Sequence, residues 1–149
     1  MSFIFDNAKG RWVEKYLLPL GGDNIGVVLL QSSGLQVDST LNNYATLSTL
    51  LASNTEAAFT NYARIWLSGS SITVSVNTST GVTTVSISSQ VWNSAGGATN
   101  NTLGALLTVY RPTSATADSG ILPLTKHEFA VSTTGGNLTA TISSIGTET

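Results

Sequence analysis

The stretch 68–89 constrains the fold more than any other part of the chain. In its first half three β-branched apolar residues alternate with Ser and Thr, and two more do so after turn-forming residues at 77–81. These five apolar residues are Ile72, Val74, Val76, Val85 and Ile87. A period of two places such side chains on one face of a strand, and two runs joined by a short Gly-containing loop are typical of a β-hairpin. We expect its apolar face to cover a hydrophobic core.

Further apolar runs predict strands on both sides of this hairpin. The expected strands lie at 25–31, 62–67, 103–110, 121–124 and 138–143, with a short apolar pair at 91–92, a connecting segment at 127–131, loops at 93–101 and 113–120 and a tail at 146–149. The polar segment 35–60 has leucines at helical spacing, which indicates a helical turn or two. Seven or eight short strands separated by turns predict an all-β fold, a single β-sandwich or a jelly-roll-like barrel.

The N-terminal segment differs from this β body because charged residues are concentrated in it, with Asp6, Lys9, Arg11, Glu14 and Lys15 within ten positions. Apolar residues at helical spacing within 3–18 predict a short amphipathic helix with Asp6 as its N-cap. Pro19 and the glycines after it end the helix. The sequence therefore predicts an anchor segment at 1–22 and a β-sandwich domain at 23–149. Removing residues 1–18 is expected to leave the β fold intact.

Charge is scarce in this chain and sets limits on its partners. Charged residues make up 9% of the sequence, against about 25% in an ordinary protein, and the net charge is −2. No basic patch is present to bind nucleic acid. No apolar run approaches the roughly 20 residues needed to cross a membrane, and the first residues do not resemble a signal peptide. We expect a soluble protein made in the cytoplasm, with few charges to keep copies apart.

Residues with catalytic chemistry are few and scattered. His127 is the single histidine, and it stands between Lys126 and Glu128, which indicates a surface or strand-edge residue beside an ordinary ion pair. The carboxylates follow no calcium-loop or paired acid–base spacing, and the chain has no cysteine to hold zinc. We therefore predict no catalytic residue, no metal and no cofactor.

Large aromatic residues leave two interpretations open. Trp12, Trp66 and Trp92, with several tyrosines, could anchor a core or a subunit interface. The same residues could instead form a platform on which sugar rings stack. The first interpretation is the commoner use of such residues, and the second is retained as the alternative.

The order of motifs resembles a family of small virion proteins of tailed bacteriophages, the minor capsid, head-decoration or cement proteins. The matching segments are Asp23–Leu30, Asn61–Arg64, the hairpin, the segment at Trp92, Gly104–Tyr110, Ile121–Leu124, His127–Val131 and Gly135–Thr139. They extend over nearly the whole chain. In this family His127 and Phe129 would be fold positions, and Arg64 would form a structural ion pair.

The resemblance implies a non-enzymatic protein of the virion, assembled in the host cytoplasm. Its expected partners are the major capsid protein and further copies of itself, most simply as a homotrimer, with no nucleic acid and no membrane. The candidate capsid or subunit interface is Phe3, Phe5, Trp12, Tyr16, Leu17, Trp66 and Trp92. The alternative function is a tail-fibre or head-fibre module that binds host-surface carbohydrate.

Overall fold

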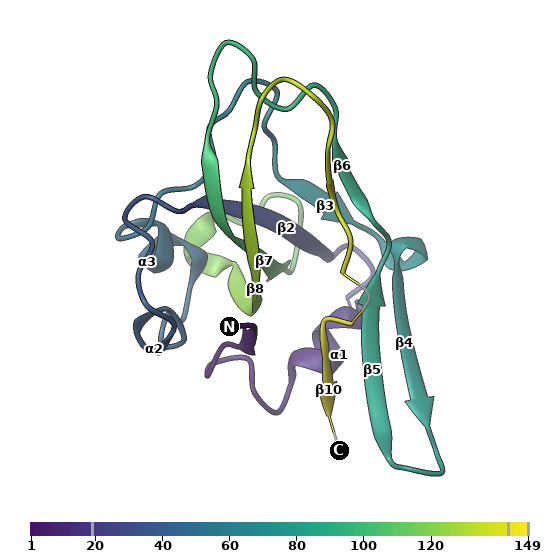
Figure 1. Cartoon of the computed structure of the whole chain (residues 1–149). Helices are drawn as coiled ribbons and strands as arrows, with labels where there is room; N and C mark the ends of the chain where they lie inside the picture. The colour runs from purple at the N-terminus through teal and green to yellow at the C-terminus, as the bar shows by residue number, and fades with distance from the viewer. Residues whose placement is uncertain (19, 143, 149) are drawn as a thin grey trace.

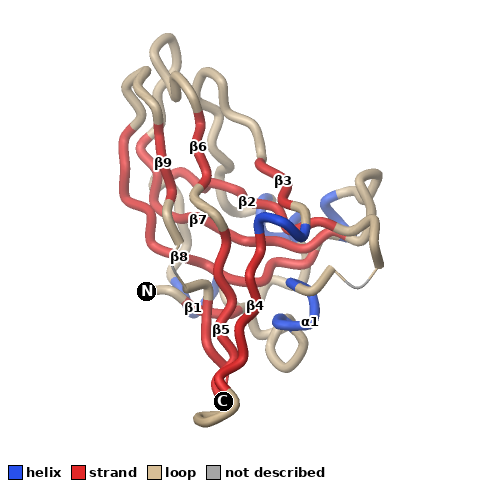
Figure 2. The backbone as a smooth tube through the Cα atoms, turned by 90° about the vertical axis from the view of Figure 1, so that its right-hand side faces the viewer, coloured by secondary structure: helices blue, strands red, loops and turns tan. Residues whose placement is uncertain are grey.

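The computed structural model describes residues 1–18, 20–142 and 144–148, and it is built mainly from antiparallel β-strands (Figures 1 and 2). The strands are β1 Phe3–Ile4, β2 Asn24–Gln31, β3 Ile65–Leu67, β4 Ile72–Asn77, β5 Val82–Ile87, β6 Gln90–Trp92, β7 Thr102–Arg111, β8 Leu122–Ser132, β9 Leu138–Ala140 and β10 Gly146–Glu148. The helices are α1 Trp12–Tyr16, α2 Asp38–Leu41 and α3 Leu47–Leu51, with 3₁₀ turns at Gly69–Ser71 and Asp118–Gly120. The predicted all-β class is confirmed.

The first layer is a five-stranded sheet in the order β1-β8-β7-β2-β3. Its central strands, β2 and β7, are buried on both faces, which explains why they read as continuous apolar runs in the sequence. β7 ends at Arg111, directly before Pro112, which has no N–H to donate to a neighbouring strand. This sheet, rather than the hairpin, forms the centre of the molecule.

The second layer consists of β4, β5, β6, β9 and β10, in two small sheets that continue one another. β5 leads into β6 after two residues, while β10 pairs with β5 and β9 pairs with β6. Ile145 N donates to Val85 O at 2.7 Å, and the Ser89 and Thr141 hydroxyls lie 3.1 Å apart. The chain from β5 to β6 therefore stays in contact with the chain from β9 to β10 between the two sheets. The predicted tail at 146–149 is therefore wrong in its described part, because residues 146–148 form β10.

The hairpin prediction is confirmed in its strands and only partly in its packing. β4 and β5 pair without a break from Ile72–Ile87 to Asn77–Val82. Val85 and Ile87 are buried in the core, whereas Val76 is 59% exposed. Figure 1 shows why: the tip of the hairpin extends beyond the body, so only its base covers the core.

β8, Leu122–Ser132, is a single long strand, where the sequence predicts only a short strand at 121–124. Thr125, which reads as part of a polar break, pairs with Thr108 of β7. The two buried hydroxyls lie 2.6 Å apart, and Thr108 also meets the hydroxyl of Tyr16. Mutual hydrogen bonding makes these polar groups tolerable inside the core, and burial raises the pKa of Tyr16.

The N-terminal segment is part of the same core and is mostly not helical. Phe3 and Ile4 form β1 against β8, and the helix begins only after Arg11, which provides no side-chain cap. Asp6 is not the N-cap, because Arg11 occupies the cap position, and the Asp6 carboxylate instead accepts a hydrogen bond from Lys9. Gly10 adopts φ +79°, a conformation that interrupts a helix. Residues before the predicted boundary at residue 22 therefore contribute to the same hydrophobic core as residues after it.

Candidate interaction surfaces

The structure divides the seven predicted interface residues by exposure. Four are buried within the chain, namely Phe5, Trp12, Tyr16 and Trp92, each with at most 3% of its surface exposed. Phe3 and Trp66 are half-buried, and Leu17 is 62% exposed. Buried residues fill the chain's own core, so a partner can reach only the last three of the seven in this structure.

Trp66 on β3 is covered by Arg111, whose guanidinium carbon lies 3.6 Å from the ring centroid. Arg111 is held in place by hydrogen bonds to the side chain of Asn24, and its pKa is lowered by burial. The indole also packs against Gly26 on the adjacent strand, where a Cβ atom would lie 2.4 Å from the ring. The Trp66 ring is therefore part of a stacked structural unit, with a cation where a sugar would have to stack.

The remaining aromatic groups are also engaged within the chain. Trp92 donates its indole N–H to the carbonyl of Ala63 at 2.8 Å. The Tyr110 hydroxyl donates to Asp23 at 2.8 Å, and burial, followed by this bond, raises the pKa of Tyr110 to about 12. Tyr44 donates to Gln36 at 2.7 Å. The described Trp, Tyr and Phe residues are all buried or half-buried, so none offers the exposed ring that stacking on a sugar would need.

Arg64 joins two carboxylates that are distant in the sequence. Its guanidinium donates two hydrogen bonds to Glu56, both at 2.7 Å, and two to Asp118, at 2.6 and 2.9 Å. These bonds raise the pKa of Arg64, and the hydrogen bond from Arg64 lowers the pKa of Asp118. The ion pair inferred from the resemblance is confirmed, and it fastens the 113–120 loop to the body. Neither partner could be identified from the sequence.

The expected ion pair between Lys126 and Glu128 is present, but nothing in the sequence indicates that Lys126 is buried. Its side chain is only 2% exposed, and its ammonium group donates to Asp38 at 3.0 Å and to Glu128. Burial opposes the charge on Lys126, but these hydrogen bonds outweigh burial and raise its pKa. Asp38 lies 88 residues away, so local sequence contained no sign of the pair.

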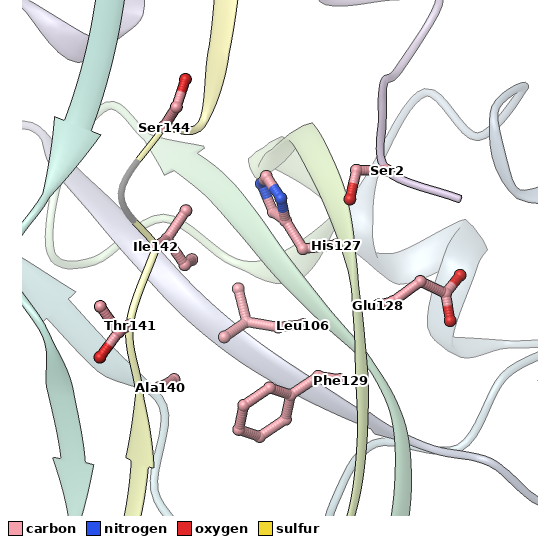
Figure 3. A pocket seen from close by; sticks show the side chains of 9 residues that line it. All are labelled: Ser2, Leu106, His127, Glu128, Phe129, Ala140, Thr141, Ile142 and Ser144. Carbon is pink, nitrogen blue, oxygen red and sulfur yellow. The ribbon is translucent and has the colours of Figure 1, made fainter.

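His127 lines a small cavity between the layers, at the side where β8 faces the segment after β9 (Figure 3). The cavity has a volume of about 220 Å³ and is bordered by Phe129, Ile142 and other side chains of both layers. The Nε2 atom lies 2.9 Å from the hydroxyl of Thr125. Burial, and then the charge on Lys126, lower the pKa of His127. In the described part of the chain no carboxylate hydrogen-bonds this imidazole, so the orienting partner of a catalytic triad is absent there.

Almost the whole second layer is without charge. Residues 65–110 and 129–147 contain no Asp, Glu, Lys, Arg or His. These ranges include the hairpin, β6, β9 and two loops, at 93–101 and 133–137. We call these two loops together the loop end. Figures 1 and 2 show the loop end at the opposite end of the molecule from the hairpin tip. Hydrogen bonds tie its two loops together, from Ala95 N to Gly136 O and from Gly135 N to Ala95 O, both at 2.8 Å.

Across the described ranges, no group of three His, Cys, Asp or Glu side chains is placed to hold a metal ion. None of the helices described is long and apolar enough to span a membrane. Comparisons of the chain with protein-family models, curated proteins and solved structures found no match.

Proposed function

We propose that this chain is a non-enzymatic structural protein of a bacteriophage virion, which decorates the assembled head by binding the major capsid protein. The observation that carries the proposal is the uncharged second layer. Charged residues are depleted at the centre of protein interfaces, because taking a charge out of water costs more than its new contacts return unless it is well paired. A layer of Ser, Thr, Asn and small apolar residues can be covered by another protein without that cost.

Binding alone is sufficient for this function. A protein that binds the assembled shell but not its separated subunits stabilises the shell by RT ln(1 + [L]/Kd) for each site. The motif order supports the same assignment, since the segments that resemble head-decoration proteins extend over nearly the whole chain. No step of the proposed function calls on His127 or on any cofactor.

We place the shell contact at the loop end. It carries no charge, and its loops are held together by main-chain hydrogen bonds, so little ordering is needed on binding. The N-terminal segment is a poorer candidate for the contact than the sequence implies, because its large aromatic residues lie in the core.

Co-sedimentation with phage heads assembled without this protein tests the proposal. Ala98→Glu places a charge on an exposed residue of the loop end, and Ser79→Glu places the same charge on the exposed hairpin tip. We expect the original chain and Ser79→Glu to pellet with the heads and Ala98→Glu to remain in the supernatant. Failure of the original chain to pellet refutes the decoration function, and equal binding of both variants refutes the loop-end contact.

A further inference from the structure

β4 is an edge strand with one side open. In the second layer it pairs with β5, and among the described residues no other strand pairs with it. Figure 1 shows β4 on the outside of the molecule, and Figure 2, viewed from that side, shows it in front of the body. α1 lies close to β4, deeper in the body in Figure 1 and on the side away from β5 in Figure 2, but no main-chain hydrogen bond joins α1 to β4 among the described residues. A row of main-chain N–H and C=O groups is therefore available to another strand.

This edge has none of the features that keep monomeric proteins from pairing through their edges. Such edges usually carry a lysine, a proline or a bulge. β4 reads Ile-Thr-Val-Ser-Val-Asn, and its register with β5 is regular throughout. Val76 near its end is 59% exposed. The sequence of β4 thus favours pairing rather than preventing it.

The alternation of hydrogen bonds between β4 and β5 identifies which residues of β4 point their main-chain N–H and C=O groups to the open side. Ser88 N donates to Ser71 O at 3.0 Å, one step beyond the pair of Ile72 with Ile87. In an antiparallel pair the residues that exchange hydrogen bonds alternate with those that do not. It follows that Thr73 and Ser75 direct their main-chain groups to β5, whereas Ile72, Val74 and Val76 direct theirs to the open side.

We propose that β4 is an interface between two copies of this chain, paired antiparallel with β4 of the second copy about a two-fold axis at Val74. In this register Val74 lies opposite its own equivalent, and Ile72 lies opposite Val76 of the other copy. The outward main-chain groups are then the ones that meet, and each such pair exchanges two hydrogen bonds. Apolar side chains also meet apolar side chains on one face of the joined sheet.

Self-complementarity is what selects a second copy as the occupant. A two-fold interface joins the same surface on both chains. A charged residue on β4 would therefore lie opposite or close to the same charge on the other copy, and the two would repel. Residues 65–110 carry none. A shift by one residue would place Val74 opposite Ser75 and bring inward-facing main-chain groups to the interface. The resemblance implies a trimer, whereas this contact predicts a dimer.

A matched pair of charge variants tests the interface and its register together. Thr73 and Ser75 are exposed, and in the proposed register each lies opposite the other across the axis. Thr73→Lys with Ser75→Lys brings like charges together, whereas Thr73→Lys with Ser75→Glu brings opposite charges together. Light scattering after size-exclusion chromatography gives the mass of each full-length protein, and circular dichroism checks that each is folded.

We expect the original chain and the Lys/Glu variant to have twice the 15.5 kDa mass of one chain, and the Lys/Lys variant to show a twofold lower mass. A monomeric original chain, a trimer whose mass neither variant changes, or equal masses for the two variants would overturn the proposal. The result is independent of shell binding. A dimer that fails to pellet with heads would refute the decoration function and leave this interface standing.

Discussion

Replacing Trp12 with alanine tests whether the N-terminal segment is core or detachable anchor. Trp12 is 2% exposed, and its ring packs edge-on against Tyr16 with centroids 5.8 Å apart. Truncating a buried Trp costs about 3–5 kcal/mol, against a total stability of about 5–15 kcal/mol for a domain of this kind. With a urea slope of about 2 kcal/mol/M, the unfolding midpoint should fall by about 1.5–2.5 M.

Leu17→Ala is the matched control in the same segment, because Leu17 is 62% exposed. A surface substitution of this kind changes stability by no more than about 0.5 kcal/mol. Both variants are unfolded in urea and followed by tryptophan fluorescence and far-ultraviolet circular dichroism. Equal midpoints for Trp12→Ala and the unaltered chain would refute the packing argument. For the same reason we now expect deletion of residues 1–18 to unfold the protein, contrary to the expectation from sequence.

Two further predictions concern single sites in the body. Gly26→Ala should destabilise the fold by about 1–3 kcal/mol, since the added Cβ would lie 2.4 Å from Trp66, whereas Gly22→Ala, with open space around it, should be nearly neutral in the same urea titration. His127 should make stability depend on pH, because burial and the charge on Lys126 hold its folded-state pKa below the ordinary value of about 6.5. The unfolded chain then takes up the proton first, so stability is complete above about pH 6.5 and declines as the pH falls toward the folded-state pKa. The urea midpoint should drop between about pH 7.5 and about pH 5.5, above the range where carboxylates titrate, and His127→Gln should reduce that drop; an undiminished drop would contradict this explanation.

Local periodicity was a good guide where a strand is long and its alternation is regular. The hairpin, β2 and β7 lie close to their predicted positions because their apolar patterns reflect direct burial. β1 and β10 are two and three residues long, too short for a periodic pattern, and exist because an adjacent strand offers them partners.

The N-terminal segment shows how a correct pattern can predict the wrong element. Ala8, Trp12 and Tyr16 have helical spacing and are all buried, as that spacing implies. Gly10 nonetheless interrupts the helix, and β8 offers Phe3 and Ile4 an edge to join. Helix formation and strand pairing compete, and the outcome depends on a strand about 120 residues further along the chain.

The partners of the long-range polar contacts could not be located from the sequence. Arg64 bonds to Asp118 across 54 positions, and Lys126 bonds to Asp38 across 88. Such pairs are set by the topology of the sheet rather than by spacing along the chain. The two uncharged ranges, in contrast, can be read from the sequence. That they form one layer follows only from the strand pairing.

The most direct test of the proposed function is the thermal stability of phage heads assembled without this protein. Calorimetry records their melting temperature before and after the purified chain is added in excess. Because ligand binding stabilises the state that is bound, we predict a higher melting temperature, with the added chain recovered in the head fraction. An unchanged melting temperature, with the chain left in solution, would contradict the assignment of this protein to the capsid surface.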